Sequence, residues 1–287
     1  MTIAFSDFTR SWPLPAAAPA RTLIVVPCFN EAARLDSAAF LSALDRDPAT
    51  DFVFVDDGST DATPKVLTAL QAQRPHRITV LALARNSGKA EAVRRGLLHA
   101  AATGAAHVGY WDADLATPLD AIADFVRVMD RFQDVAVIFG SRRPMLGHRI
   151  ERTLKRRIVS RLCGVLARQA IRLPVADTQC GAKLLRTGPA LDEALAAPFT
   201  AGWLFDVELF ARLSGRVGDR RRAFYELPLA KWDEVAGSKV STRAILRGGV
   251  QMLRLIAEIR LGLALDRVRA DVPSVRVLAG NALERAA

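Results

Sequence analysis

Two aspartates stand one residue apart in the segment GYWDADLATP (109–118), directly after a small, apolar stretch. In an extended strand successive side chains alternate faces, so Asp112 and Asp114 project the same way. Two carboxylates at close range raise each other's pKa unless a cation lies between them. Mg²⁺ and Mn²⁺ take such carboxylates together with substrate phosphates. The pair therefore predicts a divalent metal site, and the alternative is one helix-capping aspartate beside a solvated one.

Polar residues also follow two other apolar segments. Asp56 and Asp57 follow FVFV and precede a Gly-Ser turn. A carboxylate there is able to accept a hydrogen bond from a nucleobase or a ribose hydroxyl, although the same residues would also form a turn and a helix N-cap. Lys89 follows Ser87-Gly88 at the start of a helical pattern, where backbone N–H groups favour phosphate. The alternative for Lys89 is a solvated lysine in the first helical turn.

Apolar runs and amphipathic segments alternate regularly through the first half of the chain. Strands are predicted at 22–27, 52–59, 77–85, 107–114 and 135–142. Helices are predicted at 30–44, from Asp61 or Thr63 onward, at 87–102 and from near Pro118. This order is typical of an α/β fold, in which helices cover both faces of a mainly parallel sheet. Ligands of such sheets bind beyond the carboxyl ends of the strands, so the polar residues should converge there.

The composition indicates a globular and basic protein. The 287 residues are 51% hydrophobic and carry a net charge of +10, so an anionic partner is expected. Nucleic acid is disfavoured, because the arginines cluster behind the predicted nucleotide site without interleaved aromatic residues. The three cysteines lack the paired spacing of zinc ligands or of a disulfide framework, which favours a reducing cytosol.

Two further segments have helical, amphipathic patterns. Residues 149–172 are rich in arginine, with Arg157, Arg161, Arg168 and Arg172 on one predicted helix face. Residues 242–265 form a second pattern, which charged residues interrupt too often for a membrane span. Both segments would suit an anionic membrane surface, so we expect a peripheral protein on the cytoplasmic face of the membrane. The alternative is that both are packing helices with solvated arginines.

These patterns divide the chain into three parts. Residues 1–21 form an N-terminal extension in which we find no signal peptide, since prolines interrupt its apolar residues. Residues 22–241 form the predicted catalytic domain, which includes the basic segment. Residues 242–287 form the amphipathic helix and a tail without a clear pattern.

Several motifs together resemble one enzyme family. VVPCFNEAARL, FVDDGSTDAT, NSGKAEAVRRGL, YWDADLATP, GSRR, DTQCGAKLLR, WLFDVELF and EVAGSKVS occur in the order and spacing of family 2 glycosyltransferases with the GT-A fold. Within that family the chain most resembles the dolichyl-phosphate or polyprenyl-phosphate β-glucosyltransferases and their mannosyltransferase relatives, over about residues 22–241. The resemblance implies an inverting enzyme that uses Mg²⁺ or Mn²⁺ to move a hexose from a nucleotide sugar to polyprenyl phosphate.

The resemblance also implies roles for single residues. The residues expected to bind the nucleotide sugar are Pro27, Phe29, Glu31, Asp56, Asp57, Lys89, Asp112, Ala113, Asp114, Ser238 and Lys239. Asp112 and Asp114 would hold the metal. The residues expected at the acceptor are Arg142, Arg156, Arg157, Gln179 and Lys183. The implied catalytic residues are Asp114, Arg142 and Asp206, and Asp206 would serve as the base if the acceptor were a hydroxyl.

One departure from the family pattern concerns the sugar. Mannosyl members typically read D-A-D-L-Q-H-P, whereas this chain has Ala116 and Thr117 after Leu115. The resemblance therefore favours UDP-glucose over GDP-mannose. A GDP-mannose donor, or a soluble or polysaccharide acceptor, remains the alternative.

Overall fold

The structure is a computed structural model. It describes residues 20–143, 149–150, 164, 168, 171–233, 250–251, 253–254, 256–257 and 275–278. The N-terminal extension up to residue 19, most of the basic segment and much of the C-terminal segment lie outside these ranges.

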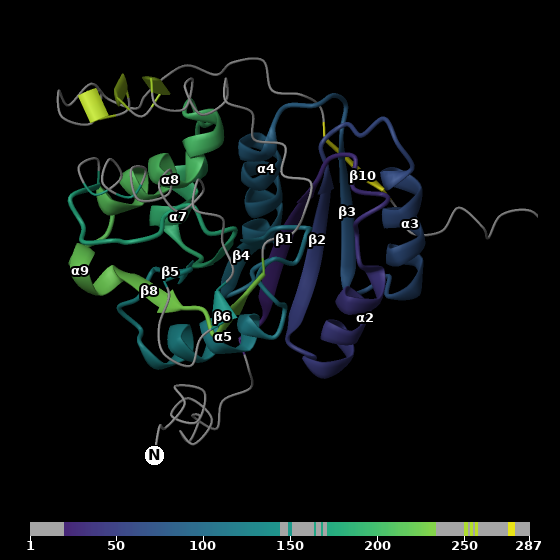
Figure 1. The fold of residues 1–287 in the computed structure, drawn as a ribbon, viewed down its shortest axis with the longest axis horizontal. Coiled ribbons are helices and arrows are strands. Elements are labelled where there is room, and N and C mark those ends of the chain that lie inside the picture. The colour runs from purple at the N-terminus through teal and green to yellow at the C-terminus, as the bar shows by residue number, and fades with distance from the viewer. Residues whose placement is uncertain are drawn as a thin grey trace, which may run out of the picture.

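Eight strands of the described chain form one sheet in the order β10-β3-β2-β1-β4-β7-β5-β8 (Figure 1). Their bounds are β1 (Thr22–Cys28), β2 (Thr50–Asp56), β3 (Ile78–Leu83), β4 (His107–Trp111), β5 (Val137–Ser141), β7 (Ala182–Arg186), β8 (Phe224–Pro228) and β10 (Val275–Leu278). β7 runs antiparallel between β4 and β5, and β10 runs antiparallel beside β3. The other neighbouring strands are parallel, which confirms the predicted fold class.

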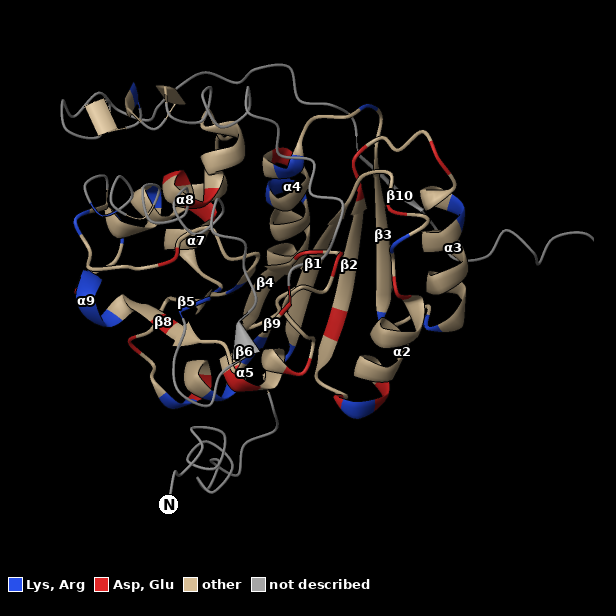
Figure 2. Ribbon diagram, viewed as in Figure 1, with Lys and Arg blue, Asp and Glu red and all other residues tan. Residues whose placement is uncertain are grey.

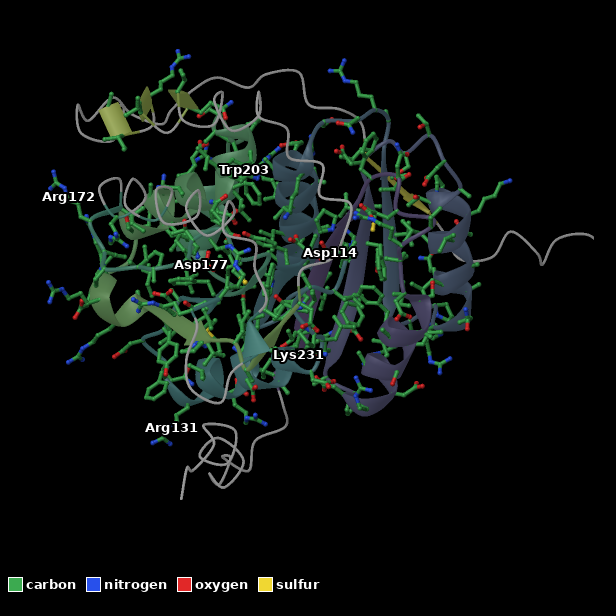
Figure 3. All side chains as sticks on the ribbon, viewed as in Figure 1. Asp114, Arg131, Arg172, Asp177, Trp203 and Lys231 are labelled. Atoms are coloured by element: carbon green, nitrogen blue, oxygen red, sulfur yellow. The ribbon has the colours of Figure 1, made fainter. Side chains whose placement is uncertain are left out.

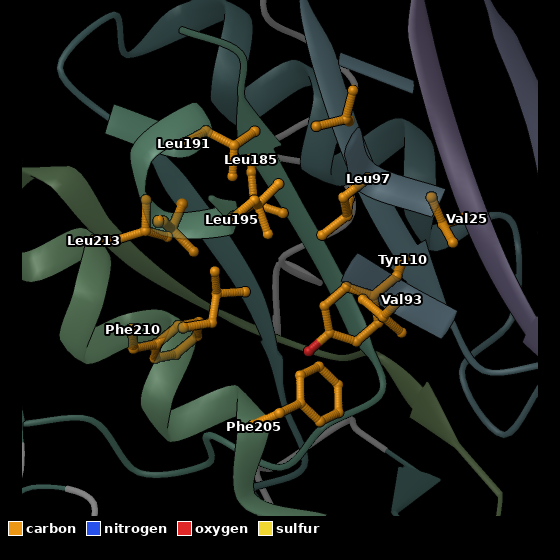
Figure 4. Packing of buried hydrophobic residues seen from close by; sticks show 14 of the residues in the cluster. Val25, Val93, Leu97, Tyr110, Leu185, Leu191, Leu195, Phe205, Phe210 and Leu213 are labelled. Carbon is orange, nitrogen blue, oxygen red and sulfur yellow. The ribbon is translucent and has the colours of Figure 1, made fainter. Parts of the chain in front are cut away.

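Helices cover both faces of this sheet. One face is covered by α4 (Lys89–Ala102), α7 (Pro189–Leu195) and α8 (Phe205–Ser214), and the other by α2 (Ser37–Arg46), α3 (Thr63–Gln73) and α5 (Ala121–Arg131). Strands buried on both faces need nearly continuous apolar sequence, and every residue of β2 is buried. Figure 4 shows the hydrophobic core between the sheet and α4, α7 and α8, to which Leu97 of α4, Tyr110 of β4 and Phe210 of α8 contribute.

Smaller elements complete the part of the chain that the structure describes. They are η1 (Gly202–Leu204), α9 (Arg220–Ala223) and a two-stranded parallel sheet of β6 (Arg149–Ile150) and β9 (Lys231–Trp232). None of the helices in the described ranges is long and apolar enough to cross a bilayer.

The predicted strand 107–114 is shorter in the structure, since β4 ends at Trp111 and Asp112 and Asp114 lie in the turn that follows it. Three other elements also differ from the predictions. α2 begins at Ser37 rather than near Asn30, because the Asp36 carboxylate accepts from Ala39 N–H and caps the helix there. In the basic segment, Arg149–Ile150 pair as strand β6, and Arg172 has a positive φ of 55° directly after helical Ile171. β10 lies in the tail, where the sequence showed no clear pattern.

Candidate active site

The site lies where polar loops follow β1, β2 and β4, as the sheet rule predicts. The N–H of Asp57 donates to the Cys28 carbonyl at 2.8 Å, which joins the ends of β1 and β2. The N–H of Asp112 donates to the Gly181 carbonyl at 2.9 Å, which joins the end of β4 to the segment before β7. Figure 2 shows acidic residues in the loops at the centre of the molecule, and Figure 3 places Asp114 there.

The loops after β1 and β2 hold each other in place. Asn30 adopts a positive φ of 53°, and its side-chain oxygen accepts from Thr60 N–H at 2.9 Å. Asn30 N–H donates to Ser59 Oγ at 2.9 Å, and Ser59 N–H donates to the Asp56 carboxylate at 3.1 Å. Pro27 and Phe29, both predicted to bind the nucleotide, are partly exposed beside these contacts. The loops therefore form a preorganised edge at the predicted nucleotide site.

Glu31 and Asp57 are buried carboxylates with partners in the protein. Arg34 donates to both Glu31 oxygens, at 2.7 and 2.6 Å. The two Asp57 oxygens accept from the N–H groups of Ser87 and Gly88 at 2.7 and 2.8 Å. Burial raises the pKa of Asp57, although these two hydrogen bonds act in the opposite direction. Asp57 thus fixes the turn that begins α4 and places Lys89.

The Asp112 and Asp114 pair lies directly after β4. Asp114 accepts from Ala116 N–H at 3.1 Å within its own turn, while buried Ala113 separates the pair. Burial, and then the charge of Asp112, raises the pKa of Asp114. The first residue of α5 is Ala121, so neither aspartate caps that helix.

Two residues determine the surroundings of Asp112. Lys89 Nζ lies 2.5 Å from Asp112 Oδ1. A Cβ atom on Gly181 would lie 1.9 Å from Asp112 Oδ2, so any larger residue here would displace the Asp112 carboxylate. No cluster of three or more His, Cys, Asp or Glu suited to a metal occurs in the described ranges. A metal on Asp112 and Asp114 would therefore need substrate oxygens to complete its ligands, which fits Mg²⁺ or Mn²⁺.

A buried group of polar side chains lies beneath this pair. Lys183 Nζ lies 2.7 Å from Asp206 Oδ1 and donates to the Cys180 carbonyl at 2.6 Å, and the Lys183 side chain is 0% exposed. Tyr110 Oη also donates to Asp206 Oδ1. Burial lowers the pKa of Lys183 to about 7 and raises the pKa of Asp206 to about 8. The predicted acceptor lysine and the predicted base are thus paired with each other.

Arg142 follows β5 and binds a carboxylate that the sequence predictions omitted. Its Nε and Nη2 donate to the two Asp177 oxygens at 2.6 and 2.8 Å, and its guanidinium stacks over Trp232 at 5.3 Å. The Glu226 carboxylate accepts from the N–H groups of Ala176 and Asp177 at 2.9 and 3.0 Å. Asp177 begins the motif DTQCGAKLLR, but its burial, which calls for a cationic partner, is seen only in the fold.

Three buried polar atoms belong to residues that lie close to Arg142 or Asp177 in the sequence. Among the residues that the structure describes, Ser141 Oγ, Thr178 Oγ1 and Gln179 Nε2 have no hydrogen-bond partner. An unpaired polar atom in a buried position is costly, so these atoms are suited to a polar ligand. Of the remaining predicted site residues, Arg156, Arg157, Ser238 and Lys239 lie outside the described residues.

Comparison with known proteins identifies the class. The chain matches the profile of Glycosyl transferase family 2 over residues 23–191 and belongs to that family. It is a glycosyltransferase with the GT-A fold, as the motifs predicted.

Individual relatives are more informative still. The chain is 29% identical over 257 residues to a dolichyl-phosphate beta-glucosyltransferase of Dictyostelium discoideum, covering 83% of this chain and 73% of that protein. It is 30% identical over 239 residues to the Homo sapiens dolichyl-phosphate beta-glucosyltransferase, covering 76% and 68%. Among solved structures, glucosyl-3-phosphoglycerate synthase from Mycobacterium tuberculosis, in complex with Mn²⁺, UDP-glucose and phosphoglyceric acid, has a similar fold, with a TM-score of 0.62, 19% identity and 86% coverage of each chain.

Proposed function

We propose that this glycosyltransferase moves glucose from UDP-glucose to a polyprenyl phosphate, with inversion at the sugar. The observation that carries the proposal is the similarity to dolichyl-phosphate beta-glucosyltransferases over 83% and 76% of this chain. The structurally similar synthase bound UDP-glucose and Mn²⁺, which supports the same donor and a divalent metal here.

In this proposal Asp112 and Asp114 hold Mg²⁺ or Mn²⁺ on the donor diphosphate. The raised pKa of Asp114 and the shortage of further protein ligands in the described ranges both fit a metal shared with the substrate. When bound, the metal supplies positive charge that stabilises the departing UDP. The edge formed by Pro27, Phe29 and Asp56 would bind the uridine.

The acceptor phosphate would bind beside Arg142. Because Asp177 engages Nε and Nη2, we assign Nη1 of Arg142 to the phosphate. Ser141, Thr178 and Gln179 offer buried polar atoms without protein partners next to it. Arg156 and Arg157 remain further candidates from the sequence. Lys183 would contribute indirectly, because its hydrogen bond to the Cys180 carbonyl holds the segment that carries Thr178 and Gln179.

The chemistry needs little from a general base. A phosphate monoester has its second pKa near 6, so the attacking oxygen is already largely anionic at neutral pH. That oxygen forms a bond to C1 of glucose while the bond from C1 to the UDP oxygen breaks, and UDP leaves with the electron pair. The enzyme aligns the two phosphates and neutralises their charge. This mechanism fits the observation that Asp206 is already paired with Lys183.

A peripheral position at the cytoplasmic face of an anionic membrane is part of the proposal. Trp203, Val250 and Leu253 are exposed by 36%, 68% and 62%. Gln251 lies against Gly202, which brings the helical residues 250, 251, 253, 254, 256 and 257 next to Trp203. Ile256 packs against the core, so this helix turns one apolar side inward and another to solvent. An exposed tryptophan beside aliphatic residues suits the boundary of a bilayer.

A panel of donors and acceptors tests the proposal. Wild-type protein with Mn²⁺ would be given UDP-glucose, UDP-galactose or GDP-mannose, and polyprenyl phosphate, polyprenol or 3-phosphoglycerate. We expect the highest kcat/KM for UDP-glucose with polyprenyl phosphate, and little transfer to polyprenol because it lacks the anionic nucleophile. Preference for GDP-mannose or for a soluble acceptor would establish the alternative that the sequence left open.

A further inference from the structure

Lys89 lies among carboxylates of the proposed metal site. Its Nζ is 2.5 Å from Asp112 Oδ1, and the two side chains are 44% and 34% exposed. In the ligand-free protein the Lys89 ammonium is therefore the counter-ion of Asp112.

The backbone beneath Lys89 is held in place. Both oxygens of Asp57 accept from the N–H groups of Ser87 and Gly88, at 2.7 and 2.8 Å. Gly88 has a positive φ of 88° and begins α4 without a capping side chain. A change in the position of the Lys89 ammonium must therefore come from its flexible side chain, which has four carbons to rotate.

Asp112 is held as firmly on the other side. Its N–H donates to the Gly181 carbonyl, and its carboxylate fills the space that a Cβ on Gly181 would take. A divalent ion would bind a carboxylate oxygen at about 2.0–2.2 Å, closer than the ammonium lies now. Two cations that share one oxygen repel each other strongly at such distances. Lys89 and a metal therefore compete for Asp112.

We propose that Lys89 is a built-in competitor of the metal, which holds Asp112 in the ligand-free enzyme and transfers to the diphosphate when the nucleotide binds. The inference rests on the proposed function, because the metal site is part of that proposal. Nucleotide binding would free Asp112 for the metal, and metal binding would free Lys89 for the diphosphate. By linkage each ligand then tightens the binding of the other by the same factor.

The test measures Mn²⁺ binding rather than turnover. Free Mn²⁺ is followed by electron paramagnetic resonance during titration of the full chain, with and without UDP, and corrected for Mn²⁺ bound by UDP alone. In the wild type we expect UDP to tighten Mn²⁺ binding about tenfold or more, within the usual range of coupling between sites. Lys89→Met should bind Mn²⁺ alone about tenfold more tightly than wild type, so UDP should tighten its Mn²⁺ binding by a smaller factor, which keeps only the part that comes from the diphosphate oxygens.

Two variants distinguish direct competition for Asp112 from a general effect of positive charge near the metal site. Arg85→Met removes one positive charge from an exposed residue on the same loop, and Lys89→Arg keeps the charge at position 89. Arg85→Met should bind Mn²⁺ alone within about twofold of wild type, because screening weakens the influence of an exposed charge that does not contact Asp112. Lys89→Arg should also stay within about twofold of wild type, because its guanidinium still competes with the metal for Asp112. Tighter Mn²⁺ binding by Arg85→Met, equal to that of Lys89→Met, would overturn the inference.

The outcomes also separate this inference from the proposed function. Wild-type protein that binds no Mn²⁺ with or without UDP would overturn the metal site itself. UDP-dependent Mn²⁺ binding in the wild type that Lys89→Met leaves unchanged would overturn only the role of Lys89.

Discussion

At the residue scale, Asp112 and Asp114 share a strand end but are held differently. Asp112 pairs with Lys89 and packs on Gly181, whereas Asp114 accepts a single hydrogen bond from Ala116 N–H. Burial and the neighbouring Asp112 raise the pKa of Asp114. Asp114 therefore lies in a buried, acidic position beside Asp112, where an added cation would be stabilised.

Asp114→Asn should leave the fold intact and lower kcat about 100-fold or more. An amide lacks the charge that a divalent ion needs, and a metal's charge stabilisation is worth several kcal/mol. UDP release would be measured for the variant and for wild type treated with EDTA, and the two should match. Full turnover by the variant in metal-free buffer would contradict the metal assignment.

Gly181→Ala should weaken Mn²⁺ binding about tenfold or more while circular dichroism stays unchanged. The new Cβ would lie 1.9 Å from Asp112 Oδ2, so the carboxylate must shift. Gly218→Ala is the matched control, since a Cβ there meets nothing within 4 Å. Equal Mn²⁺ affinity in both variants would show that the placement of Asp112 does not depend on Gly181.

Contacts between residues close in the sequence could be predicted from it, whereas contacts between residues far apart in the sequence could not. Asp112 and Asp114 stand one residue apart, so the sequence itself keeps them close, although they lie in the turn after β4 rather than in the strand that the pattern predicted. The contacts of Lys89 with Asp112 and of Arg142 with Asp177 join residues 23 and 35 positions apart, and only the folded sheet brings them together. Asp177 was therefore missed, although it lies within a recognised motif.

At the element scale, β7 explains the position of Lys183. The apolar runs of the first half predicted its strands correctly, because parallel strands are buried on both faces. β7 instead enters antiparallel between β4 and β5, where Lys183 pairs with Tyr110 in register and faces Phe210 at 5.6 Å. Nothing in the local pattern AKLLR specifies these neighbours. The sequence consequently suggested an acceptor contact for a lysine that the fold buries.

Lys183→Met should destabilise the protein by about 1–3 kcal/mol at neutral pH, because it leaves the buried Asp206 carboxyl group without its ammonium partner. The double variant Lys183→Met/Asp206→Leu should be more stable than Lys183→Met, since no charge is left unpaired. Denaturant unfolding followed by circular dichroism would measure both. A double variant less stable than the single one would contradict this account of the pair.

The loss in Lys183→Met should also grow with pH. Burial already raises the pKa of Asp206 to about 8, and removal of the ammonium would raise it further. An acid whose pKa is raised by folding binds more protons when folded, so stability falls as pH rises above the unfolded pKa of about 3.9. Because Asp206 of the wild type stays protonated up to its pKa of about 8, the two proteins should diverge above that pH, and unfolding measured at about pH 7 and about pH 10 should show the larger loss at the higher pH. A loss that does not vary with pH would indicate that Asp206 does not carry the cost.

At the scale of the whole molecule, the described C-terminal residues pack against the glycosyltransferase domain. β10 pairs with β3 at one edge of the sheet, and Ile256 packs against the core near α8. Trp203 lies on the opposite side of the molecule from Arg131, which adjoins the exposed Phe132 (Figure 3). The two exposed apolar sites are therefore separable by mutation.

Trp203→Ser/Leu253→Ser should weaken binding to anionic liposomes about tenfold or more. Each large apolar side chain removed from a membrane contact is worth roughly 1.5–3 kcal/mol when fully buried. Phe132→Ser is the control, because Phe132 is 42% exposed at the other site. Co-sedimentation at low and high salt would compare the three proteins. Wild type that ignores anionic liposomes at low salt would remove the membrane from the proposal and favour a soluble acceptor.

The most direct test of the central claim is the structure of the product. Wild-type protein would be incubated with UDP-glucose, Mn²⁺ and a short polyprenyl phosphate, and the product examined by mass spectrometry and proton NMR. We predict one hexose added per lipid phosphate, equimolar release of UDP, and a β-configured C1 derived from the α-linked donor. Release of UDP without a glycolipid, or an α-linked product, would contradict inverting transfer to a lipid phosphate.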